Sequence, residues 1–252
     1  MFEIDDQHIL VTGGSSGLGR HFAQFLASKG AKVTLAARRA EALASAVADI
    51  NAAGGKARSV ILDVTSSASI NRAMDEAESG FGPIHAVISN AGVTATRPAL
   101  EQDEQAWNSV MDTNLKGVWL VAQAAARRMV ENKVKGAIVN IASILGLRVA
   151  GSLAPYAISK AGVIQMTKAL ALEWARYGIR VNALAPGYFV TELNDAFFES
   201  EPGKALIKRV PQRRLGRLSE LDGPLLLLVS SAGSFMTGSV VAVDGGHLVS
   251  GL

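Results

Sequence analysis

Tyr156 and Lys160 stand four residues apart in a segment with the pattern of a helix, so both side chains would lie on one face, a single turn apart. A phenol with a pKa of about 10 is a poor proton donor or acceptor at neutral pH, and a neighbouring ammonium group lowers that pKa by stabilising the phenolate. The pair therefore suits acid/base catalysis at a substrate oxygen. Taken alone, the Tyr-x-x-x-Lys spacing is more often found in surface pairs.

Ser143 follows the apolar run 137–142, where a buried strand is expected to end. In open α/β sheets, ligands bind beyond the carboxyl ends of the strands, and a serine hydroxyl there can hydrogen-bond a substrate oxygen. A serine that only caps a turn is the alternative. A Ser-His-Asp hydrolase is disfavoured, because no Gly-x-Ser-x-Gly segment surrounds Ser143 and no histidine follows it before His247.

A glycine-rich segment, 12–19, joins the first expected strand to the first expected helix. Gly13 would form the tight turn, Gly17 would let the backbone approach a pyrophosphate, and Gly19 would let the helix pack closely against the strand. The N–H groups at the start of the helix would bind the anion. The alternative is a glycine turn without a ligand, since the chain has 25 glycines.

The residues after the second expected strand bear on which dinucleotide would bind. An acidic residue there holds the ribose 2′-hydroxyl of NAD, whereas an arginine accommodates the 2′-phosphate of NADP. This chain has Arg38 and Arg39 at that point, and the first acidic residue is Glu41. The pattern favours NADP and leaves NAD as the alternative. The two arginines could also be a solvated start of the next helix.

Short runs of β-branched and aliphatic residues alternate with longer helical patterns along the chain. Because these runs are almost continuously apolar, they are typical of strands that helices cover on both faces of a parallel sheet. The expected strands are 8–12, 32–36, 59–62, 84–89, 137–142, 179–184 and 240–243. The expected helices are 17–29, 40–53, 67–79, 102–131, 156–177 and 221–231.

This alternation predicts an α/β fold with a doubly wound, mostly parallel sheet and helices on both faces. Residues 1–252 would form a single domain, because no linker, repeat or low-complexity tract interrupts the pattern. Residues 188–218 are rich in charge and are expected to form a lid over the strand ends. Helices are expected to end where a glycine can take a left-handed conformation, at Gly30, Gly54, Gly80 and Gly178.

The composition excludes several classes of protein. With 49% hydrophobic and 19% charged residues, the chain should fold around a large core. It has no cysteine, and its four histidines lack paired spacing, so no disulfide and no dedicated metal site is expected. The net charge of +3 is spread along the chain and does not indicate a nucleic-acid partner. The sequence shows neither a signal peptide nor an apolar run long enough to cross a membrane, which predicts a cytoplasmic protein.

Together these motifs resemble one family, the short-chain dehydrogenases/reductases, over essentially the whole chain and in the order the family has them. The matching segments are Thr12-Gly-x-x-x-Gly17-x-Gly19, Asp63-Val64, Asn90-Ala91-Gly92, Asn114, Ser143, Tyr156-x-x-x-Lys160 and Pro186-Gly187. The resemblance implies a seven-stranded Rossmann sheet. It also implies that Tyr156 is the catalytic acid/base, Ser143 orients the substrate oxygen, Lys160 tunes Tyr156 and holds the nicotinamide ribose, and Asn114 joins a water relay to Lys160.

The cofactor contacts that the resemblance implies, together with the glycine loop and the two arginines, follow one path along the strand ends. Thr191 would contact the carboxamide, whereas Phe189 replaces the small β-branched residue that is usual in the family. The expected cofactor-binding residues are Gly13, Ser15, Ser16, Gly17, Leu18, Gly19, Arg38, Arg39, Asp63, Val64, Asn90, Ala91, Gly92, Tyr156, Lys160, Pro186, Gly187, Phe189 and Thr191.

The activity implied is hydride transfer between a nicotinamide and a substrate carbon, interconverting a ketone and a secondary alcohol. The segment from Pro186 to Asn194 is similar to that of β-ketoacyl carrier protein reductases, which favours the reductive direction on a β-ketoacyl thioester or a similar carbonyl compound. An NAD-dependent sugar or polyol dehydrogenase is one alternative, and a catalytically silent dinucleotide sensor or scaffold is another. The resemblance also implies a homotetramer that pairs the helices expected at 102–131 and 156–177.

Overall fold

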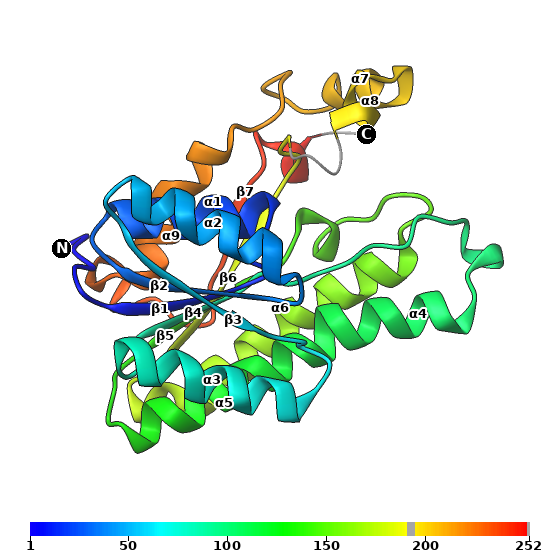
Figure 1. The fold of residues 1–252 in the computed structure, drawn as a ribbon. Helices are drawn as coiled ribbons and strands as arrows, with labels where there is room; N and C mark the ends of the chain where they lie inside the picture. The colour runs from blue at the N-terminus through cyan, green and yellow to red at the C-terminus, as the bar shows by residue number, and fades with distance from the viewer. Residues whose placement is uncertain (191–194, 251–252) are drawn as a thin grey trace.

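The computed structural model describes residues 1–190 and 195–250. Within them seven strands form one sheet, and every neighbouring pair is parallel, in the order β3-β2-β1-β4-β5-β6-β7 (Figure 1). The strands are β1 (His8–Thr12), β2 (Lys32–Ala37), β3 (Lys56–Ile61), β4 (Ala86–Ser89), β5 (Ala137–Ile141), β6 (Arg180–Pro186) and β7 (Val240–Val243). The predicted α/β fold with a doubly wound sheet is confirmed.

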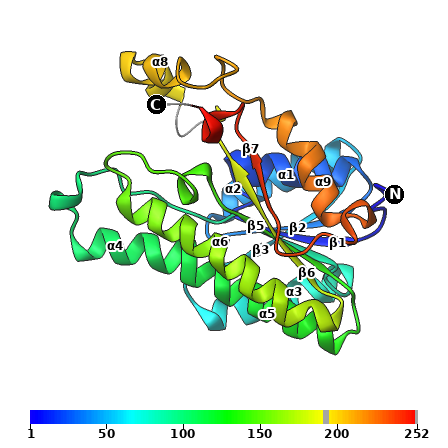
Figure 2. The same cartoon turned by 180° about the vertical axis from the view of Figure 1, so that it is seen from behind.

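Helices cover both faces of the sheet. In Figures 1 and 2, α1 (Gly17–Ser28), α2 (Ala40–Ala52) and α9 (Asp222–Val229) lie on one face. The opposite face carries α3 (Ser67–Phe81), α5 (Gly117–Glu131) and α6 (Ala154–Trp174), with α4 (Glu104–Met111) leading into α5. Two short helices, α7 (Asp195–Glu199) and α8 (Glu201–Ile207), stand beyond the strand ends within the expected lid segment.

Each face of the sheet has its own apolar core. Phe22, Leu43 and Leu225 from the first group of helices pack against one face, and Met74, Val121 and Leu170 from the second group pack against the other. The central strands β1, β4 and β5 are buried at every residue, which is why their sequences are mostly apolar.

The edge strand β3 departs from the prediction in its start and in its pattern. It begins at Lys56, three residues before the expected 59, and only Ala57 and Val60 in it are buried. An edge strand is less enclosed than a central one, so charged residues such as Lys56 and Arg58 are tolerated within it. A continuous apolar run therefore marks only part of this strand.

The expected glycine stops are correct at Gly30, Gly54 and Gly178, which have positive φ angles. The expectation at Gly80 is wrong, because α3 continues to Phe81 and Gly82 has the positive φ. Gly80 instead leaves room for the side chain of Arg58, which packs against it. A Cβ at this position would lie 1.1 Å from Nη1 of Arg58, so a side chain here would displace that guanidinium.

The carboxyl ends of β1 and β4 meet where the chain reverses its direction of winding, which is where open α/β sheets bind ligands. Thr12 at the end of β1 joins them, because its hydroxyl accepts hydrogen bonds from the backbone N–H groups of Asn90 (3.0 Å) and Ala91 (3.1 Å).

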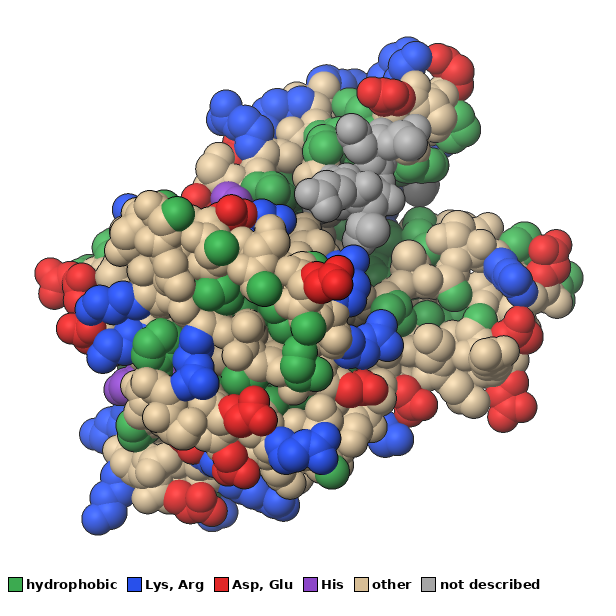
Figure 3. Space-filling model, in the orientation of Figure 1, with side chains coloured by type: hydrophobic (Ala, Val, Ile, Leu, Met, Phe, Trp, Pro, Cys, Tyr) green, Lys and Arg blue, Asp and Glu red, His purple; other side chains and the backbone are tan. Residues whose placement is uncertain are grey.

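The outside of the molecule shows mixed charge. On the face drawn in Figure 3, basic and acidic side chains are interspersed over the helices. A search of the described residues for a helix of membrane-spanning length and hydropathy found no candidate.

Candidate active site

Ser143 and Tyr156 come together because a short turn after β5 packs against the start of α6. Ser143 follows β5 and caps the 3-10 turn Ile144–Gly146 (η3), its hydroxyl accepting a hydrogen bond from the Leu145 N–H at 3.1 Å. Gly146 lies directly on α6, since a Cβ there would approach the Lys160 carbonyl to 2.7 Å. The helix starts at Ala154, two residues before the expected residue 156, and has Pro155 in its first turn. A hydrogen bond joins the Ser143 and Tyr156 side chains.

The surroundings of Tyr156 act on its pKa in two directions. Burial of the phenol raises its pKa, whereas the hydrogen bond with Ser143 lowers it, and the net direction is upward. The prediction that a neighbouring cation lowers this pKa is therefore not met in this structure. Tyr156 is set up here as a protonated donor with Ser143 as its hydrogen-bonded neighbour.

Lys160 is almost fully buried, with 4% of its surface exposed. Its Nζ donates a hydrogen bond to the backbone carbonyl of Ile141 at 2.7 Å and lies 5.6 Å from the centre of the Tyr156 ring. Burial lowers the pKa of Lys160 to about 8, because an ammonium group loses hydration in the interior. Both predicted side chains do lie on one face of α6, and Lys160 approaches the ring of Tyr156 while bonding to β5.

Asn114 sits in a π-helical turn, Asp112–Lys116 (η2), between α4 and α5. Its amide exchanges two hydrogen bonds with the backbone of Val93, each 2.8 Å long. The same amide donates to the hydroxyl of Ser159 at 3.3 Å, and that hydroxyl donates to the Tyr156 carbonyl at 2.7 Å. Asn114 thus ties the loop after β4 to α6, and these bonds reach the backbone of Tyr156 rather than Lys160.

The glycine loop has the features that a pyrophosphate site requires. Gly13 and Gly17 have φ angles of +66° and +52°, and a Cβ on Gly19 would lie 2.2 Å from the Gly13 carbonyl. Ser16, at the N-terminus of α1, makes no side-chain capping bond to the helix. The N–H groups of the first turn of α1 therefore lack a side-chain acceptor in this loop, as expected of an anion site.

The basic residues after β2 lie beside this loop. Arg39 donates from Nη2 to the hydroxyls of Ser16 (2.9 Å) and Ser15 (3.3 Å). Asp63, at the end of β3, accepts from the backbone N–H and the hydroxyl of Thr65, and these bonds lower the pKa of its carboxyl group. Arg38 adds to that lowering by its charge. Arg39 thus joins the hydroxyls of Ser15 and Ser16 in the glycine loop, and Arg38 lies near Asp63.

The other predicted cofactor residues follow the strand ends, with two differences. The Asn90 side chain donates to the Thr12 carbonyl at 3.1 Å, which gives it a bracing role as well. The Phe189 ring is buried against Gly216, where a Cβ would lie 2.3 Å from the ring. Thr191 lies outside the described residues. The remaining predicted contacts are Leu18, half-buried in α1; Val64, buried after β3; Ala91 and Gly92, after β4; and Pro186 and Gly187, at the end of β6.

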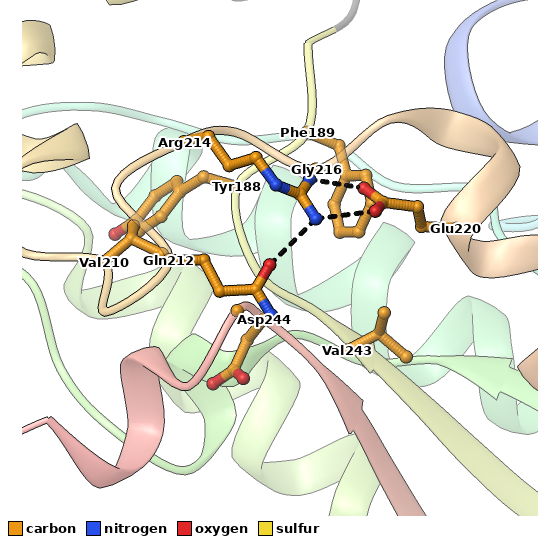
Figure 4. Close-up of a pocket in the computed structure, with 10 residues that line it drawn as sticks. Tyr188, Phe189, Val210, Gln212, Arg214, Gly216, Glu220, Val243 and Asp244 are labelled. Atoms are coloured by element: carbon orange, nitrogen blue, oxygen red, sulfur yellow. Dashed lines mark hydrogen bonds and ion pairs between the residues drawn. The ribbon is translucent and has the colours of Figure 1, made fainter.

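Figure 4 shows how the segment following α8 is fixed over the ends of β6 and β7. Arg214 pairs with Glu220 at 2.7 Å and donates to the side-chain oxygen of Gln212 at 2.8 Å, beside a pocket that also includes Tyr188 and Asp244. The hydrogen bond from Arg214 and that from the Arg217 backbone N–H lower the pKa of Glu220 to about 2. This ion pair links Arg214 of the 188–218 segment to the turn Leu218–Leu221 that precedes α9.

Three contributors to the site were missed from the sequence: the Thr12 hydroxyl, the Ser159 hydroxyl and the Ile141 carbonyl. Thr12 and Ser159 stand within motifs that were identified, yet their hydrogen-bond partners are 78 and 45 residues away in the chain. A backbone carbonyl carries no sequence signature at all. The sequence pattern predicts only that these groups lie near the ends of strands and helices.

Comparison with known proteins decides the family. The family model for short chain dehydrogenase matches residues 7–202. The chain belongs to the short-chain dehydrogenase family. It is similar to the gluconate 5-dehydrogenase of Gluconobacter oxydans (strain 621H), with 39% identity over 251 residues, covering 99% of this chain and 98% of the relative. It is also similar to the 3-oxoacyl-[acyl-carrier-protein] reductase of Escherichia coli (strain K12), with 35% identity over 237 residues and coverage of 94% and 95%.

A solved structure supports the same conclusion. The gluconate 5-dehydrogenase of Burkholderia cenocepacia J2315, in complex with NADP and tartrate, shares 37% identity with this chain and superposes with a TM-score of 0.95. The match covers 99% of this chain and 98% of that one. The protein is therefore an NAD(P)-dependent oxidoreductase of this family.

Replacing Tyr156 by phenylalanine tests its assignment as acid/base. We expect Tyr156→Phe to abolish turnover, because the ring stays while the transferable proton is lost, and to leave dinucleotide binding largely intact. Steady-state absorbance at the nicotinamide band and fluorescence titration of the cofactor measure the two effects. Tyr177→Phe, on an exposed tyrosine at the far end of α6, is the matched control. Near-wild-type turnover by Tyr156→Phe would reject the assignment.

Proposed function

We propose that the protein interconverts a secondary alcohol and the corresponding ketone of a polyhydroxylated substrate, with NADP as the preferred cofactor. The observation that carries the proposal is the assembly of Ser143, Tyr156 and Lys160 beyond the carboxyl ends of the strands, beside a glycine loop built for a pyrophosphate. A silent sensor or scaffold would need the loop and not the three side chains together.

The roles of the side chains follow from their contacts. The nicotinamide, when bound, supplies or accepts the hydride. In the reductive direction Tyr156 donates its proton to the substrate oxygen, and Ser143 donates a second hydrogen bond to the same oxygen as negative charge develops there. Lys160 does not lower the pKa of Tyr156 in this structure, and its proposed role is to hold the nicotinamide ribose. Proton transfer of this kind contributes about 10²-fold to 10⁴-fold to the rate.

The preference for NADP is supported by the group of cations and hydroxyls at the end of β2. Arg39 bridges to Ser15 and Ser16 across the glycine loop, and Arg38 lies near Asp63. The Burkholderia cenocepacia enzyme was crystallised with NADP. The end of β2 offers no carboxylate for a ribose 2′-hydroxyl, which is why NAD ranks second.

The substrate class is supported by the relatives. The Gluconobacter oxydans and Burkholderia cenocepacia proteins are gluconate 5-dehydrogenases, whereas the 3-oxoacyl reductase is less similar in sequence. The basic residues of the 188–218 segment favour a β-ketoacyl thioester as a second candidate. That support is reduced, because Arg214 and Lys204 are paired with Glu220 and Glu201.

We also propose that residues 188–218 close over the substrate and that four copies of the chain associate. The apolar side chains exposed on α4, α5 and α6 support the association, since Trp107 and Trp119 are each about two-fifths exposed and Leu172 is 84% exposed. A sedimentation mass of one chain would contradict the tetramer.

A panel of substrates with both cofactors tests the function. Gluconate, 5-ketogluconate, a neutral polyol and an acetoacetyl thioester are assayed with NADP(H) and NAD(H) by nicotinamide absorbance. We expect turnover of the polyhydroxylated substrates, with NADP(H) favoured at least 10-fold in kcat/KM. Arg39→Ala should weaken NADP(H) and spare NAD(H), because its cation would face only the 2′-phosphate. Exclusive turnover of the thioester would contradict the substrate class, and exclusive use of NAD(H) would contradict the cofactor.

A further inference from the structure

Arg148 carries a positive charge in the segment that follows Ser143. Its backbone N–H donates to the Ile144 carbonyl at 2.8 Å, so it continues the turn that begins at Ser143. Its Nη1 donates to the carbonyl of His247 and, at 2.9 Å, to the hydroxyl of Ser250. A half-buried guanidinium is thus held in a fixed position five residues after Ser143.

Arg148 is linked to the group of side chains against which Tyr156 packs. Tyr156, Tyr188 and Leu248 all pack against the small apolar cluster formed by Ile144, Leu145 and Ala157. The ring of Tyr188 lies 5.3 Å from that of His247, whose carbonyl binds Arg148. Tyr156 and Tyr188 therefore pack against one cluster, and Arg148 is joined to this group of side chains through the carbonyl of His247.

The charge of Arg148 has no partner in the part of the chain that the structure describes. Arg148 makes no ion pair with any carboxylate of residues 1–190 and 195–250. Asp244, an acid that acts on His247, is bonded instead to the backbone N–H groups of Gly246 (2.9 Å) and Leu248 (2.7 Å). Burial raises the pKa of Tyr188 and lowers that of His247, and the positive charge of Arg148 acts in the downward direction on both.

Unused hydrogen-bond donors accompany this charge. Both bonds from Arg148 start at Nη1, so within the described residues the Nε and Nη2 edge of the guanidinium has no acceptor. His247 is only 6% exposed, and its Nδ1 has no hydrogen-bond partner in the described chain. An arginine edge with two parallel N–H groups matches the two oxygens of a carboxylate.

We propose that Arg148, with His247 beside it, binds the carboxylate of a hydroxy-acid substrate while Tyr156 acts on a hydroxyl group further along the substrate. The inference rests on the proposed function and narrows it from polyhydroxylated compounds in general to those with a carboxylate. The competing role for Arg148 is purely structural, in which its two bonds hold residues 247–250 in place.

Two probes that differ only in the anionic group separate these roles. D-gluconate and D-glucitol share their hydroxyl groups, and glucitol has a CH₂OH group in place of the carboxylate. For Arg148→Gln we expect kcat/KM on gluconate to fall about 10- to 100-fold, as for loss of a charge-assisted pair, while kcat/KM on glucitol changes less than threefold. Arg148→Lys keeps the charge without the fork and should lie between. Arg72→Gln, on an exposed arginine of α3, is the control.

Binding measured without turnover distinguishes failure of the inference from failure of the proposed function. Calorimetry of gluconate with the enzyme–NADPH complex, in which the reduced cofactor cannot accept a hydride from gluconate, should give a Kd that Arg148→Gln weakens by a similar factor. If gluconate binds in an Arg148-dependent manner and is not oxidised, the proposed reaction fails and the carboxylate site stands. Equal losses on both probes would overturn the site in favour of the structural role, as would gluconate binding that Arg148→Gln and Arg148→Lys leave unchanged.

Discussion

The arrangement of this site depends on one buried cation. The ammonium group of Lys160 has little contact with water and is held by the Ile141 carbonyl, the last residue of β5. Because an unpaired charge in the interior is strongly destabilising, this bond fixes the first turns of α6 against the end of β5. Tyr156 lies one turn before Lys160 and Ser143 two residues after Ile141, so the same contact places the phenol beside the serine hydroxyl.

The parallel sheet positions the other residues of the site, because it brings segments that are distant in the sequence to one edge. The ends of β1 and β4 are joined through Thr12, and the loop that follows β4 is tied to α6 through Asn114 and Ser159. Hydrogen bonds of the Thr12, Asn114 and Ser159 side chains, together with the chain segment 90–93, thus connect the end of β1 to the backbone of Tyr156.

Much of this arrangement could be predicted from the sequence, because apolar runs indicate buried strands and glycines indicate turns that need unusual backbone angles. The strands, the glycine loop and the pairing of Tyr156 with Lys160 on one helix face were predicted from such local patterns. The extent of β3 and the role of Gly80 could not be predicted, since both depend on which neighbour packs there, and for Gly80 that neighbour is Arg58. The partner of Lys160 is a backbone carbonyl, and the cluster around Arg148 joins residues about 100 positions apart, so neither leaves a local pattern.

The direct measurement of the central interaction is the pKa of Lys160 in the protein without cofactor, followed by NMR of ¹³Cε-labelled lysines during a pH titration. Burial that is not offset by a carboxylate disfavours the charged form, so one lysine should titrate near pH 8, well below the ordinary value, and its signal should be missing from folded Lys160→Arg. A spectrum in which Lys160 titrates with the exposed lysines, near their ordinary pKa of about 10.4, would contradict a buried ammonium held against β5.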